Sequence, residues 1–275
     1  MKLYKLSYLF FVLVIFPISS YIRSAEHEIR GDWTAVRKTS SLYLQLYFKS
    51  NQSSVTLPLT AFSNLKSSEM DDARQLNFEL KRDPGFFRFV GDFYRGKGAG
   101  EFTFVPEITF PEKAEKLGYE RPTNDQLLNM AEHNLTTGYL QALYDFGFRK
   151  LTSEQLEAMM IHDVSTDYIR RMRVLGYKET DPEDFIAAKI HDVTPEYVLE
   201  LERSGYRNLS FDELKEMQIH EVTAEYIREL HRLGYNPKVA ELIEMKIHDV
   251  TPEFVSQHRT LSVDELVDLV IHGEE

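Results

Sequence analysis

The chain has 275 residues, 43% hydrophobic and 28% charged, which is enough for two domains with buried cores. It contains no cysteine, which excludes disulfides, thiolate zinc sites and a cysteine nucleophile. The formal net charge of −12 argues against nucleic acid as a partner, because a negative field repels phosphate backbones.

Residues 1–25 read as a signal peptide. Two lysines precede a continuously apolar run over residues 9–16, and small residues follow, including Ser20 and Ala25. The run is shorter than the ~20 residues that span a bilayer. We therefore expect an exported protein, periplasmic or secreted, that is free of the membrane after signal cleavage. A retained N-terminal membrane anchor is the alternative.

Residues 26–108 are expected to form a small antiparallel β domain. Leu42, Leu44 and Leu46 alternate with polar or aromatic residues, the period of two that is typical of a strand. Turns are expected at residues 83–85 and at the glycine-rich residues 96–100. These signals predict a meander of five or six strands, rolled into a sandwich or a partial barrel. The glycine-rich segment also resembles a phosphate-binding loop, but a strand rather than a helix is expected after it, so a hairpin is favoured.

Residues 109–275 contain an internal repeat with a period of 29 residues. The repeat is visible in three coincident series. Glycine–aromatic pairs occur at Gly118-Tyr119, Gly147-Phe148, Gly176-Tyr177, Gly205-Tyr206 and Gly234-Tyr235. An aromatic residue stands eight positions earlier, at Phe110, Tyr139, Tyr168, Tyr197 and Tyr226. Histidines occur at His133, His162, His191, His220 and His248.

Each repeat carries the signals of two helices. Thr194 is expected to cap the first helix, and Gly205 to end it in the left-handed conformation, which brings Tyr206 onto Leu201. The second helix is expected to begin with a capping box, and Leu214, Met217 and Ile219 to form its apolar side. The boxes are Thr123…Gln126, Thr152…Gln155, Ser210…Glu213 and Ser262…Glu265.

The predicted fold class is therefore α+β, a small antiparallel meander or sandwich followed by a solenoid of α-helical hairpins. The last repeat is expected to be irregular, because it lacks the glycine–tyrosine turn and is shortened.

The net negative charge of the chain lies in the repeats. Residues 26–110 carry 11 basic and 11 acidic residues, whereas residues 111–275 carry 18 basic and 33 acidic ones, a net charge of −15. An extended acidic surface of this kind predicts a protein partner with a basic surface.

Neither a metal site nor a catalytic or cofactor-binding site is predicted. The periodic histidines are expected at helix ends, where capping explains them, and equivalent residues of stacked helices lie roughly 10 Å apart, too far to share one ion. The acidic residues mostly follow cap positions or face outward beside lysine and arginine. We therefore expect no enzyme and no cofactor.

The repeats Ile190–Tyr197 and Leu233–Tyr235 resemble repeats in uncharacterised exported bacterial proteins, and repeats appended to membrane zinc peptidases of the beta-lactam-sensor type. In several such proteins a strand domain ends in Gly-Lys-Gly-x-Gly-x-Phe-x-Phe, which Gly96–Phe104 matches. The resemblance implies export and a bacterial origin, and no known activity. The peptidase part is absent, since His220-Glu221-Val222-Thr223-Ala224 lacks the second histidine of His-Glu-x-x-His.

The sequence thus favours a non-enzymatic exported interaction or scaffold protein whose acidic repeats bind a protein partner. Two alternatives stay open. The β domain could bind a small ligand, which a cavity among Phe78, Phe87, Phe89 and Phe102 would favour. The chain could also be an accessory sensor module of a membrane signalling system.

Overall fold

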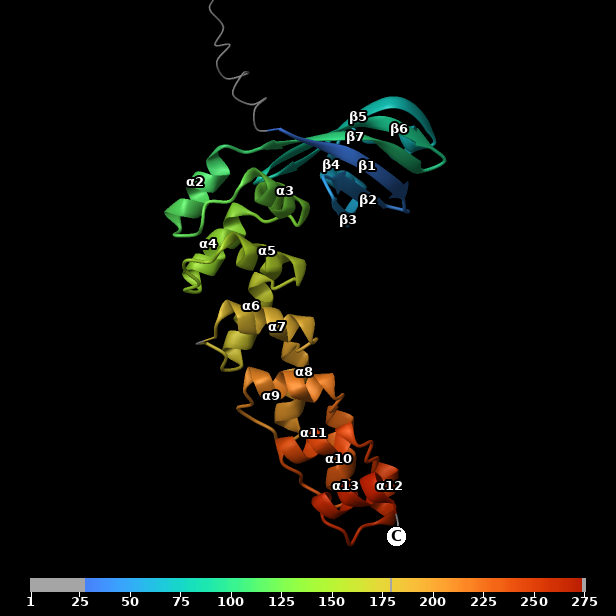
Figure 1. The fold of residues 1–275 in the computed structure, drawn as a ribbon, viewed down its shortest axis with the longest axis vertical. Coiled ribbons are helices and arrows are strands. Elements are labelled where there is room, and N and C mark those ends of the chain that lie inside the picture. The colour runs from blue at the N-terminus through green and yellow to red at the C-terminus, as the bar shows by residue number, and fades with distance from the viewer. Residues whose placement is uncertain (1–27, 179, 274–275) are drawn as a thin grey trace, which may run out of the picture. The chain divides into compact units, whose positions relative to one another are not determined.

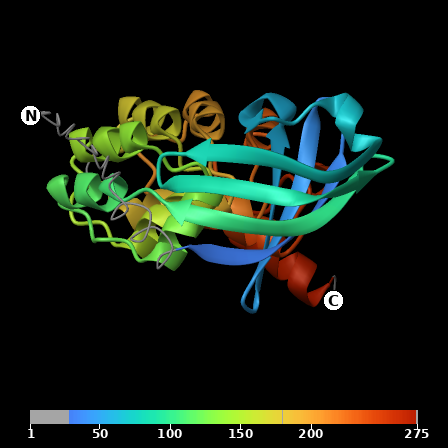
Figure 2. The ribbon, with the colours of Figure 1, turned by 90° about the horizontal axis from the view of Figure 1, so that it is seen from above.

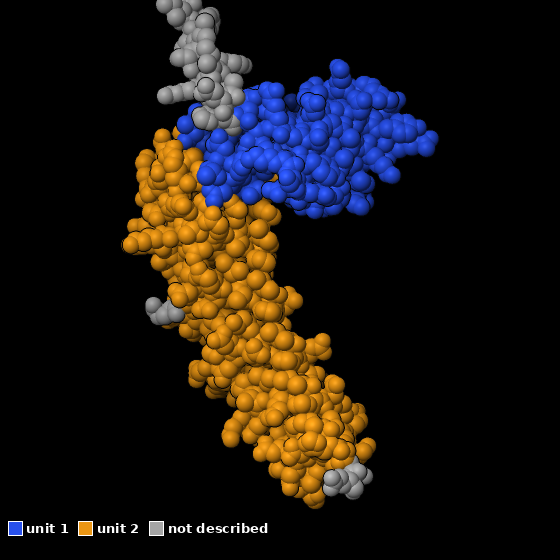
Figure 3. Space-filling view, viewed as in Figure 1, with its two compact units in different colours: residues 1–108, 123–131 blue, residues 109–122, 132–275 orange. Residues whose placement is uncertain are grey.

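The computed structural model describes residues 28–178 and 180–273. The predicted signal peptide, residues 1–25, lies outside the described residues. The chain forms two compact units, which Figure 3 distinguishes by colour. The strand unit comprises the chain up to Ile108 together with Thr123–Ala131, and the repeat unit comprises Thr109–Pro122 and the chain from Glu132 onward.

The strand unit contains one antiparallel sheet of seven strands in the order β3-β2-β1-β7-β6-β5-β4. Figure 2 shows how the sheet curls along its strands. The strands are β1 (Ile29–Arg37), β2 (Ser41–Phe48), β3 (Asn51–Pro58), β4 (Phe62–Ser63), β5 (Asp72–Arg82), β6 (Gly85–Tyr94) and β7 (Lys97–Pro106). Short 3-10 turns, η1 (Leu59–Ala61) and η2 (Ser67–Met70), flank β4, and helix α3 (Asn124–Glu132) belongs largely to this unit.

The expected meander of five or six strands is corrected in two respects. The sheet has seven strands, and β1 pairs with β7, so two meanders are joined through the first and last strands. The sequence predicts too few strands for two reasons. β3 is largely polar and has no buried residue, and β4 spans only two residues. Neither strand carries the alternating apolar pattern on which strand prediction depends.

The core of the strand unit is aromatic. Trp33 is buried, and its indole N–H donates to the carbonyl of Glu101 on the adjacent strand β7 and to that of Val90 on β6, the strand beyond it. Leu42, Leu44 and Leu46 are buried on one face of β2, which confirms the predicted alternation. A polar partner for a buried indole and period-two burial are both what a one-sided sheet core requires.

The turn expected at residues 96–100 begins one residue earlier, at Arg95. Tyr94 pairs with Lys97, so Arg95 and Gly96 form a two-residue hairpin loop, both with positive φ. The following glycines lie inside β7. A Cβ at Gly98 would stand 2.6 Å from the ring of Phe93, and one at Gly100 would stand 2.0 Å from the carbonyl oxygen of Val90. These glycines therefore permit close packing within the sheet, and the segment is a hairpin as expected.

The repeat unit consists of short helices in two layers (Figure 1). Successive helices of one layer pack on one another in the order α2, α4, α6, α8, α10 and α12, and those of the other in the order α5, α7, α9, α11 and α13. The first layer comprises α2 (Thr109–Lys116), α4 (Thr137–Asp145), α6 (Thr166–Val174), α8 (Pro195–Arg203), α10 (Ala224–Arg232) and α12 (Pro252–Gln257). The second comprises α5 (Ser153–Ile161), α7 (Pro182–Ile190), α9 (Phe211–Ile219), α11 (Val239–Ile247) and α13 (Val263–His272).

This arrangement confirms the α+β fold class and the helical-hairpin repeats. Helices of nine residues are too short to be stable alone, and stacking buries a shared core. The final repeat is irregular as predicted, because α12 has only six residues.

One predicted core residue is placed differently. Leu214 and Met217 are fully buried in α9, but Ile219 is 47% exposed. At 100° per residue, Ile219 lies about 160° round the helix from Met217, so the two face opposite sides. Its assignment to the apolar side is therefore wrong.

Candidate interaction surface

The first helix of every hairpin except the last ends in a glycine cap of one kind. Gly205 has a φ of 101°, the Tyr206 N–H donates to the carbonyl of Leu201, and the Gly205 N–H donates to that of Glu202. This is the Schellman pattern, and it confirms the predicted pairing of Tyr206 with Leu201. The same six-to-one bond joins Tyr119 to Ala114, Phe148 to Leu143, Tyr177 to Met172, and Tyr235 to Leu230.

The second helix ends in a second Schellman pattern that the sequence analysis missed. His191 is the C-cap residue of α7, Asp192 follows with a φ of 55°, and the Val193 N–H donates to the carbonyl of Ala188. The recurring His-acid-Val segments at residues 162–164, 220–222 and 248–250 do the same. An aspartate or glutamate thus takes the left-handed position that a glycine takes in the first cap.

The tyrosine side chains join successive repeats. The hydroxyl of Tyr168 in α6 donates to the carbonyl of Val193, 2.9 Å away in the cap that ends α7 and directly precedes α8. The equivalent bonds run from Tyr139 to Val164, from Tyr197 to Val222 and from Tyr226 to Val250, at 2.7–2.8 Å. We call these four bonds the tyrosine ladder. The tyrosine eight positions before Gly147, Gly176, Gly205 and Gly234 is therefore a structural connector between the first helix of a hairpin and the cap of its second helix.

A second set of tyrosine bonds comes from the glycine–tyrosine turns. Tyr177 donates to Leu209 at 2.8 Å, Tyr206 to Pro237 at 2.5 Å, and Tyr235 to Leu261 at 2.7 Å. Burial raises the pKa of Tyr177 to about 12, and raises the pKa values of the four tyrosines of the ladder further. The tyrosines are therefore explained as neutral hydrogen-bond donors of the scaffold.

One repeat lacks this second bond. Phe148 stands where Tyr177 and Tyr206 stand in later repeats and has no hydroxyl to donate. Thr180 follows Phe148 by 32 residues, and Leu209 follows Tyr177 by the same number, so Thr180 is the equivalent of Leu209. Leu151 and Leu209 are buried at this position, whereas Thr180 is half-buried.

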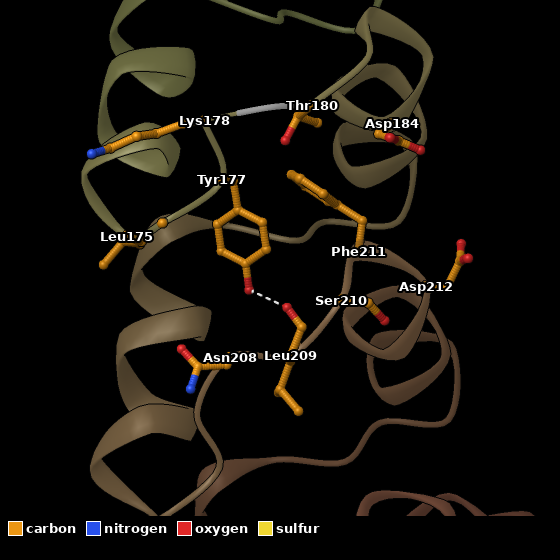
Figure 4. A pocket seen from close by; sticks show the side chains of 11 residues that line it. Leu175, Tyr177, Lys178, Thr180, Asp184, Asn208, Leu209, Ser210, Phe211 and Asp212 are labelled. Carbon is orange, nitrogen blue, oxygen red and sulfur yellow. Dashed lines mark hydrogen bonds between the residues drawn. The ribbon is translucent and has the colours of Figure 1, made fainter.

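An open hollow of about 680 Å³ lies beside Thr180, and Tyr177 and Phe211 form part of its wall. Figure 4 shows the two rings side by side, with the Tyr177 hydroxyl directed at the Leu209 carbonyl. A smaller side chain at Thr180 accounts for part of the hollow without requiring a ligand.

Four of the periodic histidines lie in the second cap. His162, His191, His220 and His248 are the C-cap residues of α5, α7, α9 and α11. Among the residues that the structure describes, three or more His, Asp or Glu side chains nowhere gather in an arrangement that could hold an ion.

The segment His220–Ala224 cannot act as a zinc-peptidase motif. It runs from the C-cap of α9 through a left-handed residue to the first residue of α10. The peptidase motif needs two histidines one turn apart on a single helix.

The four phenylalanines that would line a ligand cavity in the strand unit pack on one another instead. Phe78, Phe87, Phe89 and Phe102 are each at most 1% exposed. The ring centroids of Phe78 and Phe89 lie 4.7 Å apart, and those of Phe87 and Phe89 lie 5.9 Å apart. Stacked rings fill the space between them, so this cluster is core.

The exposed acids of the second layer form a regular series. Asp163, Asp192, Glu221 and Asp249 occupy the left-handed position after α5, α7, α9 and α11, and all four are exposed. Each of these four repeats therefore contributes one carboxylate to the surface at the same position. The repeat unit thus displays its negative charge at a regular interval.

Searches of protein-family models, of curated proteins and of solved structures found no match to this chain. None of the helices over residues 28–178 and 180–273 has the length and apolar character needed to cross a bilayer.

Proposed function

We propose that this chain is an exported, non-enzymatic interaction protein whose acidic repeats bind a protein partner with a basic surface. The observation that carries the proposal is the segregation of charge, zero over residues 26–110 and −15 over residues 111–275. A concentrated field of one sign accelerates encounter with a surface of the opposite sign and disfavours partners of like sign, including nucleic acid.

The geometry of the repeat unit supports this proposal. Tyrosines, glycines and histidines, the residue types most suggestive of a site, are engaged in caps and inter-repeat bonds. The exposed acids recur on the surface at the same position of four repeats. A stack of short helices presents such residues at a constant step, which suits an extended partner.

The test is the binding rate of a partner captured by crosslinking and isolated from the exported fraction. Its association rate with the full chain should fall between low and high salt, because the Debye length shortens from about 30 Å at 0.01 M to about 8 Å at 0.15 M. A rate that ignores salt contradicts the proposal.

A charge variant locates the surface. Four replacements neutralise the acid series: Asp163→Asn, Asp192→Asn, Glu221→Gln and Asp249→Asn. Each new side chain is isosteric with the acid it replaces, and asparagine tolerates the left-handed conformation. They should slow association. The control neutralises four exposed acids of the strand unit, Asp32→Asn, Asp71→Asn, Asp72→Asn and Glu101→Gln, and should leave the rate nearly unchanged. Equal slowing by both sets would place the interaction elsewhere.

Export is part of the same proposal and has its own test. N-terminal sequencing of the protein recovered from the producing cells should show that residues up to about Ser20 or Ala25 have been removed. An intact Met1 in the membrane fraction would support the retained anchor.

A further inference from the structure

Five isoleucines form an exposed series along the second layer of the repeat unit. Each lies nine residues after the N-cap residue of its helix, in α5, α7, α9, α11 and α13. Each is 47–55% exposed. We call Ile161, Ile190, Ile219, Ile247 and Ile271 the isoleucine series.

The series is not explained by the core of the repeats. In α5, Leu156 and Met159 are buried and hold the helix against its neighbours, while Ile161 is 55% exposed. A single exposed apolar residue needs no explanation, but the same residue at the same position of five helices does. Val174 is 81% exposed at the last position of α6, where α4, α8 and α10 have Asp145, Arg203 and Arg232, so that residue is isolated.

Exposed acidic residues precede or follow each isoleucine at fixed intervals along the chain. Two residues after Ile161, Ile190, Ile219 and Ile247 stands the exposed acid series already described. Seven residues before an isoleucine, on the same helix face, stand four further exposed acids, Glu154, Glu183, Asp212 and Asp264. Ile161, Ile190 and Ile219 therefore have an exposed acid on both sides along the chain, whereas Ile247 and Ile271 have one each.

The spacing of the series restricts the shape of a partner. The helices that carry it pack directly on one another in sequence, and helices in such contact lie about 8–10 Å apart. A polyproline II segment advances about 3.1 Å per residue with three residues per turn, so every third side chain faces the same way at about 9.3 Å. A β-strand repeats its face at about 6.7 Å, which does not match.

We propose that the isoleucine series binds an extended, basic segment of a partner protein, in polyproline II conformation, with an apolar side chain at every third residue. The apolar side chains contact the isoleucines, and lysine or arginine residues between them meet the bordering acids. A second copy of this chain is disfavoured as the occupant, because two repeat regions of net charge −15 repel each other. The inference rests on the proposed function, since it names the kind of partner that the acidic surface takes.

The test measures fluorescence anisotropy of labelled peptides with the purified full chain. The probe is a 15-residue peptide of five Leu-Lys-Pro triplets. There are two comparison peptides. One has the same composition as the probe, with the leucines grouped at one end. The other is a helix-forming lysine peptide with leucine at every seventh residue. We expect the triplet peptide to bind more tightly than either. Equal or tighter binding of a comparison peptide, or no binding of the triplet peptide, overturns the inference.

Two protein variants separate this inference from the proposed function. Combined Ile190→Ser, Ile219→Ser and Ile247→Ser should weaken binding of the triplet peptide by roughly tenfold or more, because three apolar contacts are lost. The matched control removes three exposed apolar side chains outside the series, Val90→Ser, Ile108→Ser and Val174→Ser, and should leave binding unchanged. Circular-dichroism melts confirm that both variants are folded.

The outcomes are distinguishable. If the acid-series variant weakens peptide binding and the isoleucine variant does not, the acidic surface binds without the isoleucines and the inference fails alone. If neither variant weakens it, both the inference and the proposed function fail. Loss with the isoleucine variant, together with unchanged binding in its control, supports the inference.

Discussion

The hydroxyl of Tyr197 donates a hydrogen bond to the backbone carbonyl of Val222, 2.8 Å away and 25 residues further along the chain. The bond joins the first helix of one repeat to the cap that ends the second helix of that repeat, and so fixes the spacing between stacked helices. Three further bonds of the tyrosine ladder repeat it. A recurring side-chain bond to a fixed backbone atom makes the repeats geometrically equivalent.

Tyr197→Phe should lower the stability of the repeat unit by about 1 kcal/mol, because it removes the donor and leaves a part-buried carbonyl without it. The measurement is the urea midpoint of the helical circular-dichroism signal. The control is Tyr94→Phe on the strand unit, where the tyrosine is 56% exposed, and its midpoint should not move. Equal midpoints for the two variants would show that the ladder adds nothing to stability.

The repeat unit should lose stability at alkaline pH. Burial raises the pKa of Tyr177 to about 12, above the ordinary value of 10.0. The unfolded chain therefore loses this proton at lower pH than the folded chain. The resulting stability is complete below about pH 10 and is lost as the pH rises from about 10 to 12.

The thermal midpoint measured at intervals from pH 9 to pH 12 tests this. It should fall steeply above about pH 10. Tyr177→Phe has no proton to lose at this position, so its midpoint should start lower and fall less. A variant curve parallel to that of the native protein would mean that other groups dominate the alkaline transition.

The helix boundaries followed closely from the sequence, because their signals are local. The Thr152 and Ser210 capping boxes and the Gly205 cap depend on residues within one turn of each other, and all three are present in the structure. Three coincident periodic series also made the repeat itself plain. Short-range chemistry repeated at a fixed interval is readable without knowing the fold.

What could not be predicted depends on contacts across the chain. The bond from Tyr168 to Val193 is accepted by a backbone carbonyl. Every residue type has such a carbonyl, so the sequence does not reveal which residue accepts the bond. The pairing of β1 with β7 joins strands separated by more than fifty residues, and no local pattern encodes it. Ile219 is apolar like the buried Leu214 and Met217, and only its angle round the helix, two residues from Met217, places it on the exposed side.

Gly205→Val should destabilise the repeats by more than about 1 kcal/mol, because a β-branched residue resists positive φ. The φ of Gly205 is 101°, and a Cβ there would meet nothing within 4 Å, so the effect comes from the backbone conformation alone. The urea midpoint of the helical signal is the measurement.

Gly138→Ala is the matched control for that variant. Gly138 lies within α4 at ordinary φ, and a Cβ there would approach only the Thr136 hydroxyl, at 3.8 Å. Alanine should leave the free energy of unfolding unchanged or raise it by up to about 1 kcal/mol, since alanine favours helix, and the urea midpoint should not fall. A loss of stability at Gly138 equal to that at Gly205 would refute the left-handed cap as the cause.

The final prediction concerns the repeat that lacks a tyrosine bond. Thr180→Leu places at residue 180 the side chain that Leu151 and Leu209 bury at the equivalent position. It should stabilise the repeat unit by about 0.5–1 kcal/mol by filling part of the hollow beside Tyr177 and Phe211. The control, Thr260→Leu, adds the same atoms at an exposed loop position and should have no effect.

Adding Phe148→Tyr to Thr180→Leu recreates the pair that Tyr177 and Leu209 form one repeat later. The hydroxyl then lies at the position from which Tyr177 reaches a carbonyl, and the double variant should gain about 1 kcal/mol more than Thr180→Leu alone. The acceptor is the backbone carbonyl of residue 180, and a leucine side chain there would shield the bond from water. Phe148→Tyr by itself should therefore gain less than it does in the double variant, and urea midpoints of all four proteins measure this coupling. Independent effects of the two replacements would show that the missing tyrosine and the hollow are unrelated.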